Sequence, residues 1–527
     1  MIGVAGVDNV NRFDNLTYPP GVIPSGFFGL DVGSRESGRF AINTATTNLS
    51  AVATRPLSGA IVSTTTAGFQ YQRDDSRGTT ASALGLVAGT GSLNGGVRQF
   101  TVGEPFVRNA LVGGLGQEQL AFRDRLFVTV GLRGDKNSAF GQNFGTVFYP
   151  SANASWLVSD EPFFPKPRAL TSLRLRAAYG RSGLRPGVTD TLRYYSPVTA
   201  RRDSAEQGGV TVGNLGDPNL RPERTGEFET GLDLGAFAGR ANVELTYYNK
   251  QSSDALVLVP NPPSSGFPAQ YRNLGAVSNR GFEALLTLVP VKARAAAWTS
   301  TFNFSANRNR LTKLGLPAPV VFNGGRQRHE VGYPLGGYWD RVIQSYKTVN
   351  GVVDPNSLVF SDTAQYLGSS LPTCTLGWTN DVTFFGWLRA SALVDYKGGF
   401  RQFNSSEDFR CQLARCRGLN DPTASPDRQA RSIASNVSGV NSGWIEQGDF
   451  AKLREVSLTA QLPARYARLA RARAMSVTVA GRNLHTWTKY SGVDPEVNSV
   501  GASNFAQSDF LSQPQVRYAT VRVNVSY

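Results

Sequence analysis

Hydrophobic and polar residues alternate one by one along much of this chain. In the stretch ANVELTYYN at residues 241–249, Ala, Val, Leu and Tyr alternate with Asn, Glu and Thr. The end of the chain repeats the pattern, because three valines alternate with Arg, Asn and Ser over residues 521–526, before a final Tyr. Successive side chains of a strand point to opposite faces. The alternation therefore predicts strands with one apolar face and one polar face.

About fifteen segments follow this pattern. Most have about ten residues or more, which is the length of a tilted strand that crosses a bilayer. The segments are 40–54, 58–74, 108–121, 125–134, 147–159, 171–183, 224–236, 240–253, 281–289, 296–311, 373–384, 388–398, 449–462, 474–487 and 512–527.

The connections between these segments alternate between short and long. Outer-membrane β-barrels have short periplasmic turns and long external loops. A soluble β-sandwich has no reason to place a long loop at every second connection, and a propeller would show a fixed repeat. We therefore expect an all-β fold, an antiparallel transmembrane β-barrel with long extracellular loops and short periplasmic turns. The long connections lie near 75–107, 184–223, 254–280, 312–372, 399–448 and 488–511, with a shorter one near 135–146.

The composition excludes several other classes of protein. Of the 527 residues, 40% are hydrophobic and 10% aromatic, which is too many for a disordered chain. No window approaches the run of about 18 apolar residues that a membrane helix needs. Glycine occupies 56 positions without a period of three, so collagen is excluded.

The net charge of +15 raises nucleic acid and anionic membrane surfaces as partners. However, the basic residues are scattered singly along alternating segments and turns. We interpret this charge as a polar barrel wall and a rim exposed to water or lipid headgroups, with no nucleic-acid partner.

Motifs for catalysis are missing from the sequence, and we do not expect an enzyme or a cofactor. The two histidines, His329 and His485, lie in unrelated segments, and there is no H-E-x-x-H, G-x-S-x-G or P-loop motif. The acidic pair Asp74 and Asp75 lies near a predicted turn, which favours solvated side chains over an acid/base pair.

The three cysteines are too few for a disulfide scaffold, and their spacing does not fit a zinc site. Cys411 and Cys416 could form a local disulfide in an oxidising compartment or remain free thiols; the sequence leaves both open.

Seven segments share their order with a known protein family. They are GLRGDKNSAFGQNFGTVFYPSANASWLVSDE (131–161), LRLRAAYGRSG (173–183), GDPNLRPERTGEFETGLDLGAFAGRANVELTYYNKQSSDAL (216–256), YRNLGAVSNRGFE (271–283), VGYPLGGYW (331–339), GDFAKLREVSLTAQLP (448–463) and NLHTWTKYSGVDPEVN (483–498). Together they resemble the SusC/RagA-like TonB-dependent outer-membrane transporters. The resemblance covers most of 125–527.

The resemblance implies a barrel of about twenty-two strands that encloses a plug domain. The residues before 108 match the family poorly, and the N-terminus lacks the basic and apolar regions of a signal peptide. We therefore expect a fragment without signal peptide and plug, in which 1–107 holds an N-terminal loop and the first barrel strands and 108–527 holds the C-terminal barrel region. The loop 351–368 has only two acidic residues where the family often has an acidic loop, so we expect no bound metal.

The implied function is the import of a large nutrient, an oligosaccharide or a peptide, across the bacterial outer membrane. In the family, a SusD-like surface lipoprotein covers the barrel as a lid, and TonB acts through the plug. Two alternatives remain, a structural or passive-pore barrel that needs no energy input and a β-rich surface adhesin.

The resemblance also suggests where substrate binds. Aromatic residues of the external loops would stack on sugar faces or pack on peptide side chains, although packing within the loop is the alternative for each of them. The candidates are Tyr194, Tyr195, Tyr333, Tyr338, Trp339, Phe400, Phe403 and Trp444.

The last strand resembles the signal that the barrel-assembly machinery reads. Val521, Val523 and Val525 alternate before the terminal aromatic residue, Tyr527. An ordinary strand that happens to end the chain is the alternative.

Overall fold

The computed structural model describes residues 1–21, 32–97, 100–141, 145–165, 167–202, 205–267, 269–501 and 505–527. The chain divides into two compact units. Unit 1 comprises Met1–Ala154, Tyr179–Thr225 and Asp254–Asn273, and unit 2 comprises Ser155–Ala178, Gly226–Ser253 and Leu274–Tyr527.

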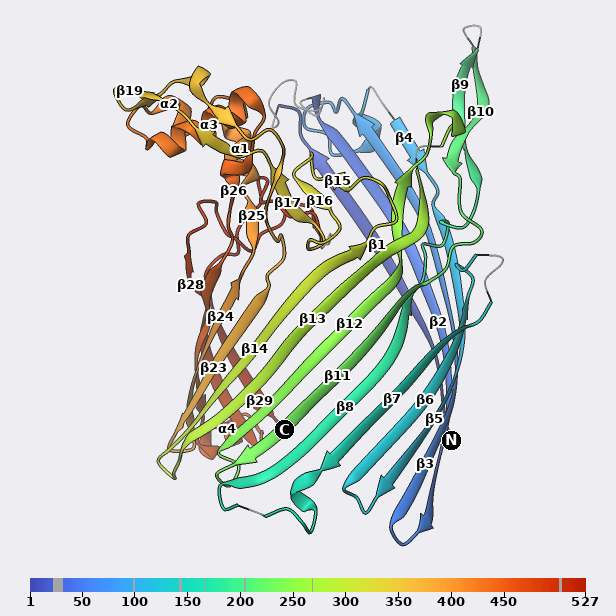
Figure 1. The fold of residues 1–527 in the computed structure, drawn as a ribbon, viewed down its shortest axis with the longest axis vertical. Coiled ribbons are helices and arrows are strands. Elements are labelled where there is room, and N and C mark those ends of the chain that lie inside the picture. Colours follow the sequence, from blue (N-terminus) through green and yellow to red (C-terminus); the bar gives the residue numbers. More distant parts are fainter. Residues whose placement is uncertain are drawn as a thin grey trace. The chain divides into compact units, whose positions relative to one another are not determined.

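Long antiparallel strands that follow one another in the chain build both units (Figure 1). In unit 1, β1 pairs with β2, β2 with β3, β3 with β5 and β5 with β6. In unit 2, the ladder runs from β13 through β14, β23, β24, β27 and β28 to β29. The long strands are β1 (Ile2–Tyr18), β2 (Ser34–Ser58), β3 (Ile61–Leu84), β5 (Phe106–Phe122), β6 (Leu126–Asn137), β7 (Val147–Leu157), β8 (Leu170–Leu184), β11 (Glu223–Ala236), β12 (Ala241–Pro260), β13 (Ala269–Lys292), β14 (Ala296–Lys313), β23 (Cys374–Phe384), β24 (Leu388–Gly398), β27 (Phe450–Gln461), β28 (Ala474–Thr488) and β29 (Tyr518–Ser526).

Strand β1 is one that the alternation does not predict. Its residues pair with β2 from Ile2 opposite Ser50 to Tyr18 opposite Ser34. Within β1, Asp8 shares a face with valines, so neither face reads as purely apolar. The expectation of an N-terminal loop before the first barrel strands was therefore wrong for residues 2–18.

Strand β3 continues ten residues beyond its predicted end at residue 74 and finishes at Leu84. Asp74 and Asp75 therefore lie within the strand, and the expectation that they lie near a turn was wrong. Asp75 accepts hydrogen bonds from Arg73 and Arg108, at 2.8 and 2.6 Å, so its charge is balanced on the strand surface.

The strand register in unit 2 sorts side chains into an apolar row and a polar row. Directly paired residues share a face of the sheet. The apolar row crosses six strands through Trp298, Val382, Ala390, Leu458, Val479 and Val521. The neighbouring row on the opposite face holds Thr383, Arg389, Thr459, Thr478 and Arg522.

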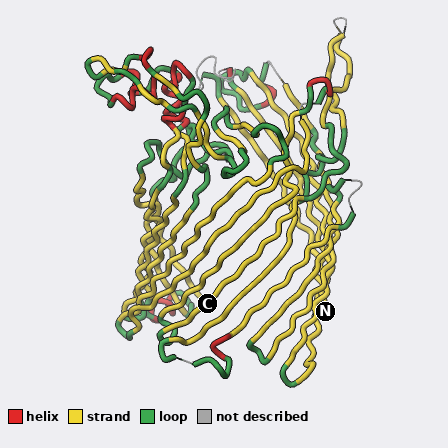
Figure 2. Tube along the Cα trace, viewed as in Figure 1, coloured by secondary structure: helices red, strands yellow, loops and turns green. Residues whose placement is uncertain are grey.

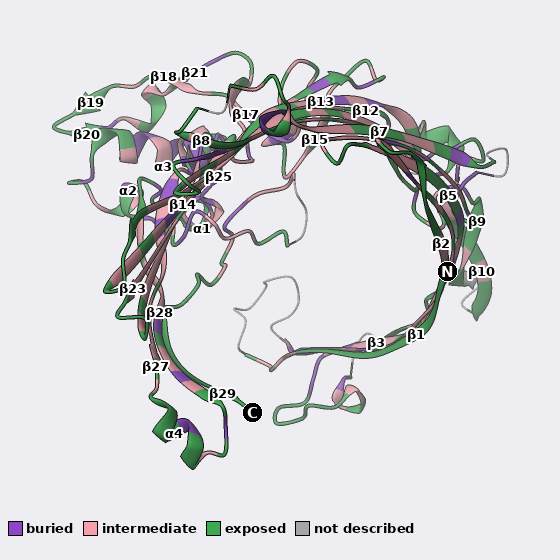
Figure 3. Cartoon of the chain, turned by 90° about the horizontal axis from the view of Figure 1, so that it is seen from below, coloured by how far each residue is buried: buried purple, intermediate pink, exposed green. Residues whose placement is uncertain are grey.

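The apolar row is exposed rather than packed in a core. Leu458, Val479 and Val521 are 48%, 51% and 70% exposed. In Figure 3, the long strands are coloured exposed and intermediate along most of their length. A hydrophobic face of this extent is the one that a barrel presents to lipid.

Short strands occupy the long connections. In unit 1, β4 (Phe100–Gly103) pairs with β3, and β9 pairs with β10 in a hairpin. In unit 2, β15, β16, β17 and β22 form a small sheet, and the pairs β18–β21, β19–β20 and β25–β26 complete the loops. The bounds are β9 (Tyr194–Arg202), β10 (Ala205–Asn214), β15 (Val320–Phe322), β16 (Gln327–His329), β17 (Gly337–Asp340), β18 (Ile343–Ser345), β19 (Thr348–Val349), β20 (Val352–Val353), β21 (Val359–Phe360), β22 (Gln365–Gly368), β25 (Arg401–Phe403) and β26 (Ile445–Gln447).

In the part of unit 2 that the structure describes, four short α-helices interrupt the β-structure, and the alternation pattern predicts none of them. The helices α1, α2 and α3 lie at one end of the unit 2 strands, whereas α4 lies near the other end (Figure 2). None of the helices in the described chain is long and apolar enough to span a bilayer. The bounds are α1 (Ser405–Gln412), α2 (Arg417–Asn420), α3 (Pro426–Ser438) and α4 (Ala464–Leu469).

A disulfide joins Cys411 to Cys416, which settles the question that the sequence left open. Both cysteines are fully buried and belong to a core with Tyr338, Phe403 and Trp444. The strands thus expose much of their apolar surface, while the loops of unit 2 build a buried core of their own.

We predict that a charge on the apolar row destabilises the protein far more than the same charge on the polar face. Leu458→Arg would place a guanidinium in lipid, at a cost of about 2–4 kcal/mol near the bilayer midplane. Its neighbour Ser457 faces the polar side, so Ser457→Arg should change the free energy of unfolding by less than about 1 kcal/mol. Denaturant unfolding in lipid vesicles measures both; equal losses would contradict the assignment of the two faces.

We also predict that the disulfide stabilises the helical segment locally. The double substitution Cys411→Ala/Cys416→Ala should destabilise residues 405–444 by about 2 kcal/mol, the value for closing a short loop. Protease cleavage within this segment should become more than about tenfold faster. Cys374→Ala, which removes a free thiol, is the control. Unchanged cleavage in the double variant would show that the cross-link stabilises nothing.

Candidate functional site

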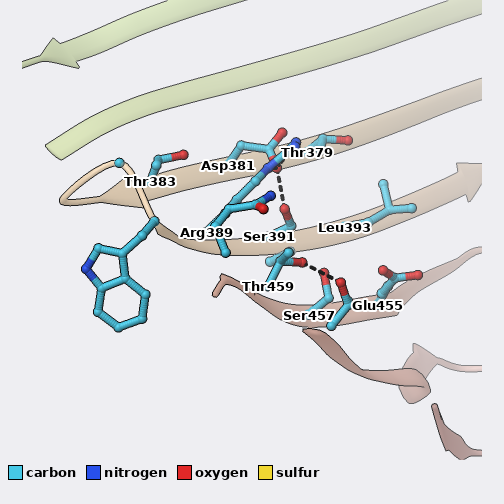
Figure 4. Close-up of a pocket in the computed structure, with 14 residues that line it drawn as sticks. Thr379, Asp381, Thr383, Arg389, Ser391, Leu393, Glu455, Ser457 and Thr459 are labelled. Atoms are coloured by element: carbon cyan, nitrogen blue, oxygen red, sulfur yellow. Dashed lines mark hydrogen bonds and ion pairs between the residues drawn. The ribbon is translucent and has the colours of Figure 1, made fainter. Parts of the chain in front are cut away.

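The polar face of β23, β24 and β27 is hollowed into a cavity of about 600 Å³ (Figure 4). Apart from Ala392, the lining residues on these strands stand at alternate positions, and the others come from β28 and from the turn between β23 and β24. They are Thr379, Asp381, Thr383, Gly386, Trp387, Arg389, Ser391, Ala392, Leu393, Glu455, Ser457, Thr459, Gln461 and Thr478.

Two ion pairs organise this wall. Arg389 donates to Asp381 through Nε at 3.0 Å and Nη2 at 2.7 Å, and the Ser391 hydroxyl donates to the same carboxylate (Figure 4). Arg482 pairs with Glu455 at 2.8 Å. The Arg389 side chain is 57% exposed, so water competes for this pair and its net contribution to stability is small.

The wall offers hydrogen bonds rather than reactive groups. The hydroxyls of Thr459 and Thr478 lie 2.9 Å apart, and either can donate or accept. The lining residues include no histidine or cysteine that could act as a base or nucleophile. Among the described residues, no group of three or more His, Cys, Asp or Glu side chains could hold a metal ion. Such a surface can contact a polar, hydrated molecule without binding it tightly.

Three of the predicted loop aromatics present their rings to solvent. Tyr194 and Tyr195, on β9 of unit 1, are 41% and 51% exposed. Tyr195 packs against Phe267 at 6.1 Å between ring centroids, and the Arg193 guanidinium lies over both rings. In unit 2, Tyr333 is 38% exposed. These side chains can meet a ligand without any rearrangement.

Tyr333 belongs to an aromatic group in unit 2 that also contains Trp339 and Tyr366. The ring centroids lie 4.7 Å apart for Tyr333 and Trp339 and 4.9 Å apart for Tyr333 and Tyr366. Arg328 lies 5.4 Å from the Trp339 ring. Two of the three residues in this group were predicted to bind substrate, Tyr333 and Trp339. Trp339 is buried, so Tyr333 is the more exposed of these two.

The other four predicted aromatics, Tyr338, Phe400, Phe403 and Trp444, are buried. The Tyr338 hydroxyl donates to the Gln507 carbonyl at 2.6 Å, and burial raises the pKa of this phenol. Trp444 and Phe403 pack with the disulfide. These rings hold the loops together, and a substrate would reach them only after the loops had moved.

The residues of the predicted assembly signal lie at the end of the chain on and beside β29. Val521 and Val523 are 70% and 54% exposed, on the face that carries the apolar row. Tyr527 follows the strand and is also exposed. Their role in assembly stays a prediction.

The sequence reasoning missed the charged residues of the cavity. Arg389 and Glu455 each stand on the polar side of a predicted alternation, and Asp381 lies in a segment that was predicted as a strand. What the alternation cannot supply is the register between strands, which brings Asp381 opposite Ser391.

Comparison with known proteins identifies the fold. The family described as "TonB dependent receptor-like, beta-barrel" matches residues 5–404. TonB-dependent receptor P26 of Formosa agariphila is 27% identical over 455 residues, which cover 78% of this chain and 46% of that protein. TonB-dependent receptor SusC of Bacteroides thetaiotaomicron is 27% identical over 271 residues, which cover 48% of this chain and 27% of that protein.

A solved structure shows the same fold over the whole chain. The structure of the RagAB peptide transporter superposes with a TM-score of 0.79 at 21% sequence identity, over 100% of this chain and 60% of the other. The chain spans about half the length or less of the curated relatives it matches.

We predict that the exposed and buried aromatics respond differently to truncation. Tyr338→Ala should leave a cavity in the loop core and destabilise it by about 3–5 kcal/mol. Tyr195→Ala, at a half-exposed ring, should cost less than about 1 kcal/mol. Hydrogen exchange of the amides of β17 for Tyr338→Ala, and of β9 for Tyr195→Ala, measures each effect. Similar losses of hydrogen-exchange protection in both variants would show that exposure does not distinguish the buried aromatic residues from the exposed ones.

Proposed function

The chain belongs to the TonB-dependent receptor-like β-barrel family, and on that premise we propose that it supplies the barrel of an outer-membrane transporter that imports an oligosaccharide or a peptide. The observation that carries this proposal is the sorting of side chains in unit 2. Exposed apolar residues such as Leu458 and Val479 occupy one face, and the hydroxyl-rich cavity with its half-exposed ion pairs occupies the other. A barrel with a lipid face and a wet wall can pass a polar molecule through a bilayer.

The chemistry of the wall and loops supports the proposed substrate class. A wall of threonine and serine hydroxyls exchanges hydrogen bonds readily with a hydrated solute. The open rings of Tyr194, Tyr195 and Tyr333 can stack on sugar faces or pack on peptide side chains. Both chemistries fit a large nutrient and support the predicted binding role of these residues. We propose no catalytic step.

The family supports a set of proposed partners. A SusD-like surface lipoprotein would cover the loop end of the barrel, and TonB would supply energy through a plug domain. The barrel-assembly machinery would recognise Val521, Val523, Val525 and Tyr527 at the end of the chain, and outer-membrane lipid would surround the apolar row.

We predict that an in-frame deletion of the gene lowers uptake of one class of labelled oligosaccharide or peptide at least about tenfold, a change of about 1.4 kcal/mol in the barrier. Loss of TonB should lower the same uptake by a similar factor, and restoring the gene should rescue the first strain only. Uptake that survives without TonB would favour a passive pore. Loss of surface attachment with unchanged uptake would favour an adhesin.

A further inference from the structure

Six charged side chains meet at the loop end of β24 and β27 in unit 2. They come from two neighbouring strands and from the segment 490–498, which follows β28. Three are basic and three are acidic, so their charges cancel. The residues are Asp395 and Lys397 on β24, Lys452 and Arg454 on β27, and Asp494 and Glu496 in the segment 490–498.

Lys452 is the centre of the cluster. Its ammonium donates to both carboxylate oxygens of Asp494 at 2.8 Å and to Glu496 at 3.0 Å. The Lys452 and Asp494 side chains are only 4% and 9% exposed. A buried ammonium of this kind depends on its partners, because removal of one leaves an uncompensated charge in a poorly solvated place.

Glu496 joins the two strands to the segment. It accepts hydrogen bonds from Lys397 and Arg454, both at 2.8 Å, as well as from Lys452. Burial disfavours the charge of Glu496, but these three donors outweigh it and hold its pKa below its ordinary value of 4.5. The carboxylate therefore stays ionised at neutral pH, and its ion pairs are lost only in acid well below that value.

A bulge in β27 aims Arg454 at this cluster. Leu453 and Glu455 pair with consecutive residues of β24, so Arg454 is the extra residue of the strand. A bulge re-aims the side chain of the extra residue. Arg454 reaches Asp395 at 2.5 Å and Glu496 at 2.8 Å, so one guanidinium ties the strand pair to the segment.

The chain around and beyond the segment 490–498 also bonds to the connection between β24 and β27. Asn404 donates to the Ser491 hydroxyl at 3.0 Å, and Gln402 donates to the Val497 carbonyl at 3.0 Å. Further along, the Ser406 amide donates to Asp509 at 3.1 Å. These bonds tie residues 402–406 to the last long connection.

The same connection holds the loop between β14 and β23. Gln507 donates its amide to Gln327 at 3.0 Å and accepts from the Tyr338 hydroxyl. Both neighbouring loops are therefore hydrogen-bonded to described residues that follow β28: the connection between β24 and β27 at 491, 497 and 509, and the loop between β14 and β23 at 507.

We propose that these six residues form an ionic latch that holds the segment 490–498 on the polar face of β24 and β27 and thereby fixes the two neighbouring loops. Lys397 lies on the same face of β24 as Arg389 and Ser391 of the cavity. The latch thus fixes the structure at the loop end of the polar wall. This inference concerns the positions of the loops and does not depend on the transport proposal.

A cysteine reporter tests the latch. Ser508 is 5% exposed, so in a Ser508→Cys variant a maleimide should react slowly while the last connection is held in place. The background carries Cys374→Ala, since Cys374 is free and the other two cysteines form the disulfide. Labelling is measured on the protein in isolated outer membranes, and heat-modifiable gel mobility confirms that each variant is folded.

Lys452→Gln should raise the labelling rate of the reporter at least about tenfold, because Asp494 and Glu496 lose their shared cation. Glu496→Gln, which leaves the pair of Lys452 and Asp494 intact, should give a smaller rise and serves as the deciding variant if Lys452→Gln does not fold. Arg417→Gln is the control, since it removes an exposed ion pair between Arg417 of α2 and Asp421, the residue that follows this helix. Folded latch variants that label at the parent rate would overturn the proposal, as would an equal rise in the control.

Discussion

In the hydrocarbon of a bilayer there is no water, so the backbone must form its hydrogen bonds within the protein. That constraint shapes the rest of this structure. A strand amide that faces hydrocarbon has no water to bond, so each must find a partner on a neighbouring strand. The antiparallel ladders of both units meet this demand over long stretches, as in the pairing of β2 with β3 from Ser34 to Ser58. Once the strands are paired, the alternation of side chains between the two faces of the sheet determines which of them contact lipid. The row through Leu458, Val479 and Val521 and the wall that carries Asp381 and Arg389 are two results of the same register.

Beyond the strand ends water is available again, and the loops follow different rules. The loops of unit 2 bury aromatic rings around a disulfide, add short helices and place charged groups in a shielded cluster. This is the organisation of a small soluble domain, in which a local core limits movement. The chain therefore combines strands stabilised by pairing with loops stabilised by packing and charge.

The sequence predicts those features that depend on near neighbours in the chain. Strand β24 was predicted with the bounds that the structure shows, because every second residue from Leu388 to Tyr396 is apolar. Helix α3 also had local signals, since Pro426 opens it and Gly439 ends it with a positive φ. The segment was nevertheless predicted to be part of a long loop. The burial of Tyr338 could not be predicted, because its hydroxyl partner, Gln507, lies 169 residues away. The cavity depends on register between strands, which the pattern of a single strand does not contain.

The bulge at Arg454 changes which residue numbers of β27, odd or even, face the polar side of the sheet. From Glu455 onward, odd-numbered residues face the polar side; before Arg454, Lys452 does so although its number is even. If β27 kept all of its residues but paired with β24 without the bulge, the start of the strand would rotate by half a turn. Phe450, which is now buried beneath cationic side chains, and Lys452 would then exchange sides with Ala451 and Leu453. The bulge therefore keeps these four side chains on their present faces, whereas deletion of Arg454 would give a regular strand with the same faces and would remove only one charge.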